Sequence, residues 1–482
     1  MSLGAKQLVR ELGKIVGRKN VLHHPEDLLV YEYDGSIDRS VPQVVALPAN
    51  TREVSQVVAL GYRHDIPIVG RGSGTGLSGG AIAAMGGIQI ALARMNRILE
   101  VDRDDRLATV QPAVINLNLD NRVRQYGMRY APDPSSQRAC SIGGNVAENA
   151  GGPHCLAYGV TTNHVLGLEV VLEDGSIERL GGSTRETPGY DLRGVFVGSE
   201  GTFGIATSAT VRLLPAPPAV KTFQGVFPDV PSACNAVSAI IGRGIVPAAM
   251  EMVDALTIKA VQSVMDAGYP DSAGAVLLIE VEGTGDEVAE LEAEVRPALR
   301  DARSTDVRTA TDAADRERLW SGRKGALGAL GSLAPNYYLV DGVVPRTQLA
   351  SVLERVEEVS REYRFPIANV FHAGDGNLHP CILFDERRDG ELERVTEAGG
   401  ELLRICVESG GTLSGEHGIG LEKKAYMPLV FNDEDMETMK RVRHAFAPKG
   451  TFNPGKIFPG GPELTHNVQP NAVAMAGPGA YV

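Results

Sequence analysis

Two glycine-flanked histidine blocks in the last third of the chain carry residue types that bind metals and move protons. The first, FHAGDGNLHP, predicts a tight hairpin in which His372 and His379 lie opposite each other, and directly opposed strand residues point to the same face. Two imidazoles on one face make half of a divalent-metal site. In the second block, SGEHGIG, Glu416 can complete the ligand set and leave positions open for substrate. His417 would then be available as a base. The alternative is that these histidines have only structural roles.

Three glycine-rich segments in the first half are of the kind that binds phosphate groups. The first, GRGSGTGLSGG at residues 70–80, directly follows a predicted strand, and its backbone N–H groups can curl into an anion site. The others are APDPSS with SIGGNVAENAGG (131–136 and 141–152) and GSEGTFGI (198–205). Three such segments within about 140 residues indicate a long ligand held along its length by main chain.

The first segment also contains the G-x-G-x-x-G pattern of dinucleotide sites, with Glu100 at a suitable distance for a ribose contact. A glycine-rich turn without a ligand is one alternative. An NAD site of the Rossmann type is another, but it fits poorly because the glycine-rich run continues toward a predicted strand at 88–91, where a helix should stand.

Together, the three segments resemble the FAD-binding domain of the vanillyl-alcohol oxidase type (the para-cresol methylhydroxylase fold) over roughly residues 41–215. The resemblance implies that the first loop cradles the pyrophosphate and that the later segments line the flavin and adenine ends. No histidine lies between Gly70 and Gly152, so we expect non-covalent FAD, with His154 and His164 as ordinary loop histidines. The expected FAD-binding residues are Arg71, Gly72, Ser73, Gly74, Thr75, Gly76, Leu77, Ser78, Pro132, Asp133, Ser136, Ser141, Gly143, Gly144, Asn145, Asn149, Gly151, Tyr158, Gly159, Glu200, Gly204, Ile205 and Asn453.

The histidine blocks, with FNPGK at residues 452–456, resemble the C-terminal domain of FAD-linked oxidases. That domain is shared by D-lactate dehydrogenases, D-2-hydroxyglutarate dehydrogenase and the FAD-binding subunits of glycolate oxidase, and the resemblance to the last group runs nearly end to end. It implies that the residues named above as ligands, His372, His379 and Glu416, hold Zn, Mn or Fe, and that His417 is the base.

The resemblance also assigns a substrate-binding residue. Arg323, in LWSGRK, would clamp the substrate carboxylate, a role that suits a guanidinium; the alternative is an arginine on a helix surface. The 2-hydroxyglutarate enzymes have a Thr and a Lys where this chain has Leu327 and Tyr338. A short monocarboxylate is therefore favoured over a dicarboxylate, and Tyr338 is included among the candidate catalytic residues.

The function implied is FAD-dependent oxidation of glycolate or D-lactate to the 2-oxo acid, with hydride passing to the flavin. D-2-hydroxyglutarate or another D-hydroxy acid is the alternative substrate. Three other classes remain open: an NAD-dependent dehydrogenase, a metal-dependent hydrolase, and a non-catalytic FAD-binding subunit of an electron-transfer complex. Relatives in bacteria imply a second flavin-type subunit and an iron–sulfur subunit as partners, because the five cysteines here form no CxxC pair.

Composition limits the binding partners and the cellular location that we expect. The net charge of −13 argues against nucleic-acid binding. No stretch of 18 apolar residues occurs, so we expect no membrane span. Residues 1–20 lack the apolar core of a signal peptide and predict a surface helix. We therefore expect a cytoplasmic protein, or one held peripherally at the inner membrane by a partner subunit.

The pattern of strands and helices around these residues predicts an α+β protein. We expect a two-part FAD-binding domain of the para-cresol methylhydroxylase type, followed by a ferredoxin-like substrate domain with a helical cap. Strands are predicted at 41–47, 66–69 and 205–214, with a hairpin at 165–180 turning at Asp174-Gly175. Prolines at 215, 217 and 218 mark a boundary. The predicted divisions are an N-terminal helical segment (1–40), the FAD-binding domain (41–217), the substrate and metal domain (218–460) and a flexible tail (461–482).

The second half is predicted as alternating strands and helices with the helices on one face of the sheet. Its strands are expected at 223–227, 250–253 and 275–282, and its helices at 256–267, 287–300, 319–330, 349–363 and 392–408.

Overall fold

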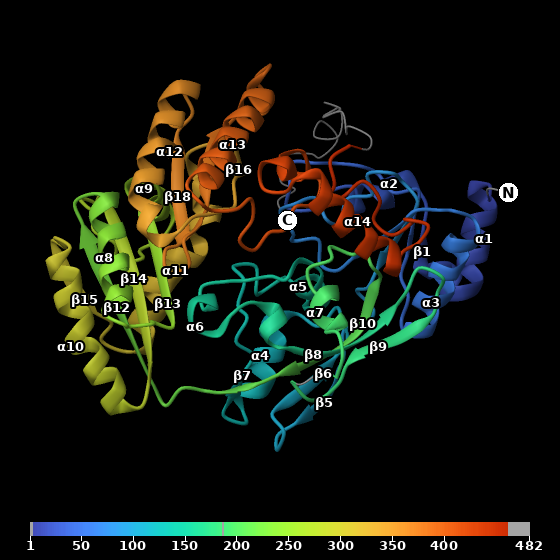
Figure 1. Cartoon of the computed structure of the whole chain (residues 1–482), viewed down its shortest axis with the longest axis horizontal. Helices are drawn as coiled ribbons and strands as arrows, with labels where there is room; N and C mark the ends of the chain where they lie inside the picture. Colours follow the sequence, from blue (N-terminus) through green and yellow to red (C-terminus); the bar gives the residue numbers. More distant parts are fainter. Residues whose placement is uncertain (1–2, 186–187, 461–482) are drawn as a thin grey trace.

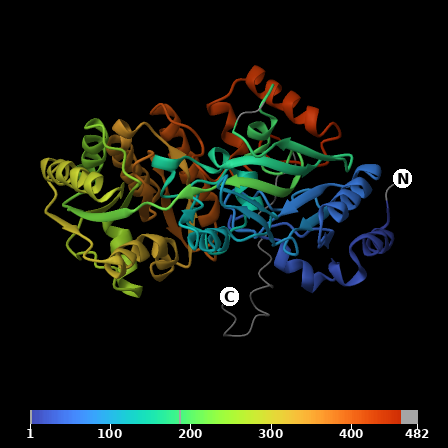
Figure 2. The same cartoon turned by 90° about the horizontal axis from the view of Figure 1, so that it is seen from below.

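The computed structural model describes residues 3–185 and 188–460 and divides them into two lobes (Figures 1 and 2). We call residues 3–217 together with 433–458 the first lobe, and residues 218–432 the second lobe. The predicted tail at 461–482 lies outside the described residues. Within the described residues, no helix is both long and apolar enough to span a bilayer.

The first lobe contains two main sheets. The smaller has the strand order β1-β2-β4-β3, with β2, β4 and β3 parallel. The larger is antiparallel, in the order β5-β6-β10-β8-β9, and β7 and β11 form a separate pair. The strands are β1 (Val21–Leu22), β2 (Val44–Ala46), β3 (Ile68–Arg71), β4 (Ile88–Ala91), β5 (Ile98–Asp102), β6 (Leu107–Val110), β7 (Met128–Arg129), β8 (Val165–Val171), β9 (Ile177–Gly181), β10 (Ile205–Arg212) and β11 (Leu214–Pro215).

Local sequence explains these elements well. Helix α3 (Thr51–Arg63) begins after Asn50, whose side chain accepts the N–H of Glu53 at 3.0 Å. The Glu53 carboxylate accepts from Ala49, one residue earlier than a capping box requires. The predicted hairpin is confirmed as β8 and β9, with Gly175 at a φ of 92° in the turn. The other helices of this lobe are α1 (Ala5–Val16), α2 (Pro25–Leu28), α4 (Asn116–Arg124), α5 (Ile142–Glu148), α6 (Cys155–Tyr158), α7 (Leu192–Phe196) and α14 (Asp433–Phe446).

The second lobe is one nine-stranded sheet. Its main path is β15-β12-β14-β13-β18-β19-β17, and β20 joins β18 to β16. The strands are β12 (Ala219–Phe227), β13 (Ala249–Asp254), β14 (Ala275–Gly283), β15 (Asp306–Thr309), β16 (Asn336–Leu339), β17 (Gly342–Val343), β18 (Ile367–His372), β19 (Asn377–Leu378) and β20 (Pro380–Phe384). The helices are α8 (Val230–Gly242), α9 (Ala255–Val264), α10 (Gly285–Asp301), α11 (Ala313–Ala329), α12 (Leu349–Tyr363) and α13 (Glu391–Glu408).

Helices cover both faces of this sheet, and the expectation of one covered face was wrong. Residues of α8, α10, α12 and α13 form one core with alternate strand residues such as Leu277 and Ile279. Residues of α9 and α11 form a second core on the other face with Val276 and Leu278. The reason lies in β14, where residues 275–281 are all buried; a strand apolar on both sides needs cover on both sides.

Residues 433–458 return to the first lobe. Phe446 of α14 stacks on Phe203 with ring centroids 4.7 Å apart, and Phe452 forms a β-bridge with Ile68. Ala447 and Phe452 are buried in the same core as α1 and α3. The predicted range 218–460 therefore includes a segment that completes the core of the first lobe (α14, red in Figure 1).

Candidate active site

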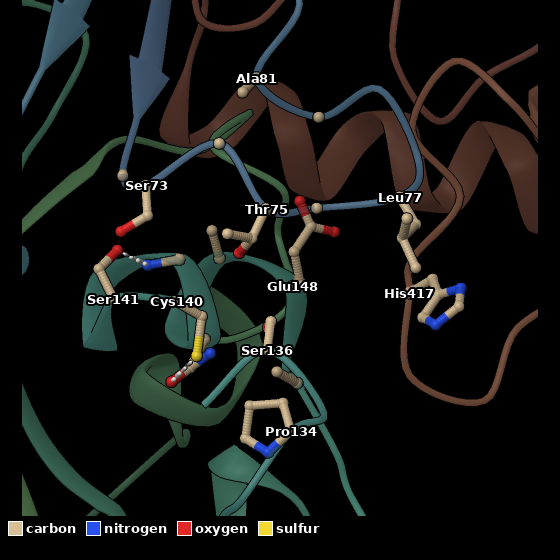
Figure 3. Close-up of a pocket in the computed structure, with 18 of the residues that line it drawn as sticks. Ser73, Thr75, Leu77, Ala81, Pro134, Ser136, Cys140, Ser141, Glu148 and His417 are labelled. Carbon is tan, nitrogen blue, oxygen red and sulfur yellow. Dashed lines mark hydrogen bonds between the residues drawn. The ribbon is translucent and has the colours of Figure 1, made fainter. Parts of the chain in front are cut away.

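A cavity of about 380 Å³ lies between the glycine-rich segments of the first lobe and the facing surface of the second, within the usual range for ligand sites. Figure 3 shows Thr75 and Leu77 on one wall, Ser136 and Ser141 on another, and His417 beside Leu77, on the side away from Ser141. The lining extends from Ile205 and Ala206 in the first lobe to Arg323, Leu327 and Val370 in the second. One cavity thus joins the predicted cofactor and substrate regions.

The glycines of the cavity wall allow backbone to approach backbone. A Cβ at Gly72 would collide with the Ser141 hydroxyl, and one at Gly143 would lie 2.6 Å from the Pro112 Cβ. Gly74 has a φ of 69°, in the region that favours glycine. The result is a cradle of main-chain groups that a pyrophosphate fits. The residues present therefore fit a dinucleotide cofactor.

Most of the predicted cofactor residues line this cavity. They are Arg71, Gly72, Ser73, Gly74, Thr75, Gly76, Leu77, Ser136, Ser141, Gly143, Gly144, Asn145, Glu200, Gly204 and Ile205. Glu100, considered for a ribose contact, is exposed on β5 and is not among the lining residues.

The remaining predicted cofactor residues do not line the cavity and have structural partners instead. Tyr158 donates to Glu282 of the second lobe, and Asp133 accepts from His154. Asn453 donates to the carbonyls of Gly80 and Glu200. The rest of this group are Ser78, Pro132, Asn149, Gly151 and Gly159. They were predicted from their place beside the glycine segments in the sequence, and their part in cofactor binding stays a prediction.

Sequence reasoning missed Glu148, which lines the cavity at the last turn of α5. Burial and the nearby Glu200 carboxylate raise the pKa of Glu148 well above its usual range. Both effects favour the protonated form of this side chain. A signal was available, because Ser141, Asn145 and Glu148 recur at helical spacing and share one face.

The predicted metal ligands come together, although not by the predicted pairing. In the hairpin His372 pairs with Asn377, not with His379. His379 lies two residues further on, hence on the same face as Asn377, and the two imidazole centroids are 5.1 Å apart. The four-residue turn 373–376 fixes this register. Ligand atoms of His372, His379 and Glu416 lie within 4.8 Å of one another.

Glu416 faces both histidines. Its Oε1 lies 3.1 Å from His372 Nε2 and 3.5 Å from His379 Nε2. Although burial opposes ionisation, the facing His372 lowers the pKa of Glu416 to about 2, so the carboxylate is charged at neutral pH. The buried Nε2 of His379 has no hydrogen-bond partner among the described residues. A charged carboxylate with an unsatisfied imidazole nitrogen is a donor set that fits a divalent cation.

Asp341, which sequence reasoning did not single out, holds the loop that carries Glu416 and His417. Its carboxylate accepts hydrogen bonds from the Ser414 hydroxyl at 2.6 Å and from the N–H groups of Gly415 and His417 at 3.0 and 3.1 Å. Lys423 Nζ balances its charge at 3.1 Å. The buried carboxylate of Asp341 therefore fixes the position of His417.

His417 lines the cavity with its ring stacked on His379 at 4.9 Å. Burial lowers its pKa to about 4, with the Asp341 charge opposing the shift. At neutral pH the imidazole is therefore uncharged, the form that accepts a proton.

Glu251 connects the predicted carboxylate clamp to the predicted ligands. Its Oε2 lies 2.7 Å from Nη2 of Arg323 and its Oε1 lies 2.7 Å from Nδ1 of His372. Arg323 is only 3% exposed, which excludes the alternative of a surface arginine. A glutamate at the centre of the apolar strand AMEMVD was the sequence signal that could have revealed this link.

Tyr338, predicted as a catalytic residue, does not line the cavity. Its ring is buried in the core formed with α12 and α13, and its hydroxyl bonds to Glu422. On β16 the neighbouring residue, Leu339, lines the cavity. Side chains alternate along a strand, so Leu339 facing the cavity turns Tyr338 away from it.

Comparison with known families identifies the class of this protein. The family described as FAD linked oxidases, C-terminal domain, matches residues 216–457, and the FAD binding domain family matches residues 42–181. The chain belongs to the FAD-linked oxidases and is an FAD-dependent oxidoreductase.

Similar proteins extend along nearly the whole chain. Glycolate oxidase subunit GlcD of Escherichia coli (strain K12) is 47% identical over 440 residues, 91% of this chain and 88% of that protein. The GlcD of Bacillus subtilis is 40% identical over 94% of this chain and 97% of its own length. A D-lactate dehydrogenase of Archaeoglobus fulgidus is 34% identical over 93% of this chain and 98% of its own.

Among solved structures, para-cresol methylhydroxylase with bound substrate has a TM-score of 0.79 and 18% identity, covering 94% of this chain and 96% of that one. The 4-ethylphenol oxidase of Gulosibacter chungangensis has the same TM-score, with 19% identity and coverages of 94% and 97%. The predicted fold class is thereby confirmed.

Proposed function

We propose that this enzyme oxidises a short 2-hydroxy monocarboxylic acid, glycolate or D-lactate, to the 2-oxo acid. The observation that carries the proposal is the meeting of Arg323 with the His–Glu cluster at one end of the cofactor cavity. Similar proteins named glycolate oxidase subunit and D-lactate dehydrogenase support the same substrate class. Bound FAD supplies the two-electron acceptor.

The side chains divide the work. Arg323 binds the substrate carboxylate: it lines the cavity, and besides the contact of its Nη2 with Glu251, its buried Nε has no hydrogen-bond partner among the described residues. His417 accepts the hydroxyl proton of the substrate at a ring nitrogen. His372, His379 and Glu416 hold a divalent Zn, Mn or Fe ion, which when bound supplies a positive centre for the substrate oxygens.

The walls around Arg323 favour a small substrate. Leu327, Leu339 and Val370 line this end of the cavity and offer no charge. Lys324 is the one observation that favours a second candidate, a dicarboxylate such as D-2-hydroxyglutarate, because it lines the cavity beside Arg323. Its side chain is exposed, and its ammonium lies 5.9 Å from the Trp320 ring centroid.

We infer that FAD is bound without a covalent link. His154 and His164, the histidines closest in sequence to the glycine segments, are engaged with Asp133 and with the Tyr158 carbonyl. Neither is among the lining residues. Acid precipitation of the purified enzyme should release all of its yellow colour into the supernatant, and colour that stays with the pellet would contradict a non-covalent link.

The decisive experiment is anaerobic bleaching of the flavin band near 450 nm by glycolate, D-lactate, L-lactate and D-2-hydroxyglutarate, with and without a chelator. His417→Ala should retain FAD and lose bleaching, whereas His444→Ala, an exposed histidine on α14, should bleach normally. Normal bleaching by His417→Ala would remove it from the mechanism. Bleaching by D-2-hydroxyglutarate alone would replace the proposed substrate with the dicarboxylate.

The word subunit in the names of the GlcD relatives supports an assembly. We propose that a second flavin-type subunit and an iron–sulfur subunit accept the electrons and hold this chain peripherally at the inner membrane. Affinity purification from native extract should return both partners, and recovery of this chain alone would count against them.

A further inference from the structure

A row of charged side chains joins the two lobes next to the active site. Two glutamates of β14 in the second lobe, Glu280 and Glu282, point to the same face of the strand. From the first lobe, Arg129 binds both oxygens of Glu282 at 2.6 and 2.9 Å, and His154 meets Glu280. Because Arg129 occupies both oxygens of Glu282, this cluster is an ion-pair network and not a metal site.

Both ring nitrogens of His154 face carboxylates. Nδ1 lies 2.7 Å from Asp133 Oδ2, and Nε2 lies 3.2 Å from Glu280 Oε1. A neutral imidazole can donate from only one nitrogen, so satisfying both contacts requires the imidazolium. Although burial opposes the charge, Asp133 and Glu280 raise the pKa of His154 well above its usual value. A cation with two opposed donors therefore bridges a carboxylate of each lobe.

The bridge continues into the helix that carries the substrate clamp. The second oxygen of Glu280 accepts from Trp320 Nε1 and from the Thr222 hydroxyl, both at 2.8 Å. The Trp320 ring also stacks on His154, with centroids 6.1 Å apart and an interplanar angle of 25°. Trp320 lies on α11 one turn before Arg323, which lines the substrate end of the cavity.

The other end of the bridge lies on the cofactor side. Asp133 accepts both the backbone N–H and Nδ1 of His154, and the next three residues in the chain, 134–136, line the cavity. The path therefore runs from the cofactor wall through Asp133, His154 and Glu280 to Trp320 and α11. Each of its contacts is a hydrogen bond made by a buried or largely buried group.

We propose that His154 is a positioning residue that sets the substrate clamp on α11 against the cofactor wall of the first lobe. This inference rests on the proposed function, because it assigns Arg323 to the substrate carboxylate. His154 does not line the cavity, so its action passes through Glu280 and Trp320.

The neighbouring ion pair provides a matched control. Arg129 and Glu282 also join the two lobes through β14, and Tyr158 shares Glu282 at 2.6 Å. Within residues 3–185 and 188–460, no hydrogen bond of this pair leads to α11. Loss of Arg129 should thus weaken the contact between lobes, whereas loss of His154 should also displace the clamp.

The kinetic test compares His154→Gln with Arg129→Gln in the FAD-loaded enzyme. Gln cannot donate to two opposed carboxylates, so His154→Gln should raise the half-saturating acid concentration for bleaching about tenfold while FAD content stays native. Arg129→Gln should lower the melting temperature and leave that concentration within about twofold. His154→Arg retains a cation with several donors and should restore most of the affinity. Equal effects of the Gln variants, or none at His154, would overturn the proposal.

A second readout does not need turnover. Trp320 is the only tryptophan of the chain, and a stacked imidazolium withdraws density from the indole. At equal FAD occupancy, Trp320 emission should rise in His154→Gln and stay native in Arg129→Gln. Unchanged emission in His154→Gln would refute the bridge. If no hydroxy acid bleaches the native enzyme, the proposed function fails, and the emission alone decides whether His154 holds α11.

The pH dependence of this emission follows from the charges around the ring. Asp133, Glu280 and Glu282 surround His154, while Arg129 and Lys324 lie beyond Glu282 and Trp320. Because the two carboxylates of Asp133 and Glu280 raise the pKa of His154, emission should rise only at a pH above the ordinary titration range of histidine. Asp133→Asn should move that rise to lower pH, and an unmoved midpoint would contradict the pairing.

Discussion

Replacing Glu251 by Gln tests whether the clamp and the ligand cluster depend on one buried carboxylate. Glu251 contacts Arg323 and His372, each at 2.7 Å, and is 1% exposed. Gln has nearly the same shape but no charge. Its amide can accept from one partner and must present N–H groups to the other, so one of the two cations loses its anion.

The magnitude follows from these two contacts. A hydrogen bond to a charged group contributes about 1.5–3 kcal/mol, and a neutral one about 1 kcal/mol. Losing one charged contact and weakening the other removes about 3 kcal/mol, which corresponds to roughly a 150-fold fall in the second-order rate constant of flavin bleaching. Metal content should fall as well, because partners that orient ligating histidines typically change metal affinity about 10- to 100-fold.

Stopped-flow bleaching under anaerobic conditions gives the rate constant, and elemental analysis gives the metal content. Asp254→Asn is the control: Asp254 lies three residues further along β13, caps α9 and bonds to Asn369. That variant should lose stability without a comparable loss of bleaching. A rate constant for Glu251→Gln within threefold of native, at native metal content, would refute the coupling.

Further variants address the cofactor cradle, the pH dependence of stability and the role of Tyr338. Gly143→Ala should weaken FAD binding at least about tenfold in a fluorescence titration, because its Cβ would meet Pro112, while Gly285→Ala, with nothing within 4 Å, should bind FAD normally. Burial lowers the pKa of His164 to about 4, so the stability it gives is full above its unfolded pKa and is lost as the pH falls toward 4, by about 3 kcal/mol at most. Urea titrations at pH 7 and 4.5 should therefore show native and His164→Gln converging; parallel shifts would contradict this. Tyr338→Phe should lose about 1 kcal/mol of stability with its Glu422 bond and bleach at the native rate; a slow variant would return Tyr338 to the mechanism.

The sequence was sufficient wherever the signal was local. The helix at 349–363 begins and ends as predicted in α12, since an unbroken apolar face runs through it. The Asp174-Gly175 turn defines its hairpin in the same way. The four residues of the cluster His372, His379, Glu416 and His417 were also found, because each carries its chemistry in a short glycine-flanked segment.

The sequence did not show which side chains face each other across strands, or which residues far apart in the chain are in contact. His372 pairs with Asn377, two residues before the predicted partner His379, and the length of the turn, which the glycines do not reveal, decides this register. Glu251 lies more than 70 residues from Arg323 and is joined to it only by the packing of β13 against α11. Asp133 and Tyr158 sit beside the cofactor segments in sequence but serve the contact between lobes, which a single chain pattern does not show.

Because residues 433–458 complete the first lobe, the two lobes of a newly made chain fold in a fixed order. Ala447 and Phe452 belong to the core that contains α1 and α3, and the whole second lobe is encoded between the two parts. During synthesis the second lobe emerges as one continuous segment and can fold at once. The first lobe cannot complete its core until the segment that contains Ala447 and Phe452 has been synthesised. Cofactor loading is therefore expected as the last event of biogenesis, and a chain cut short before Phe452 would carry a folded second lobe and no flavin.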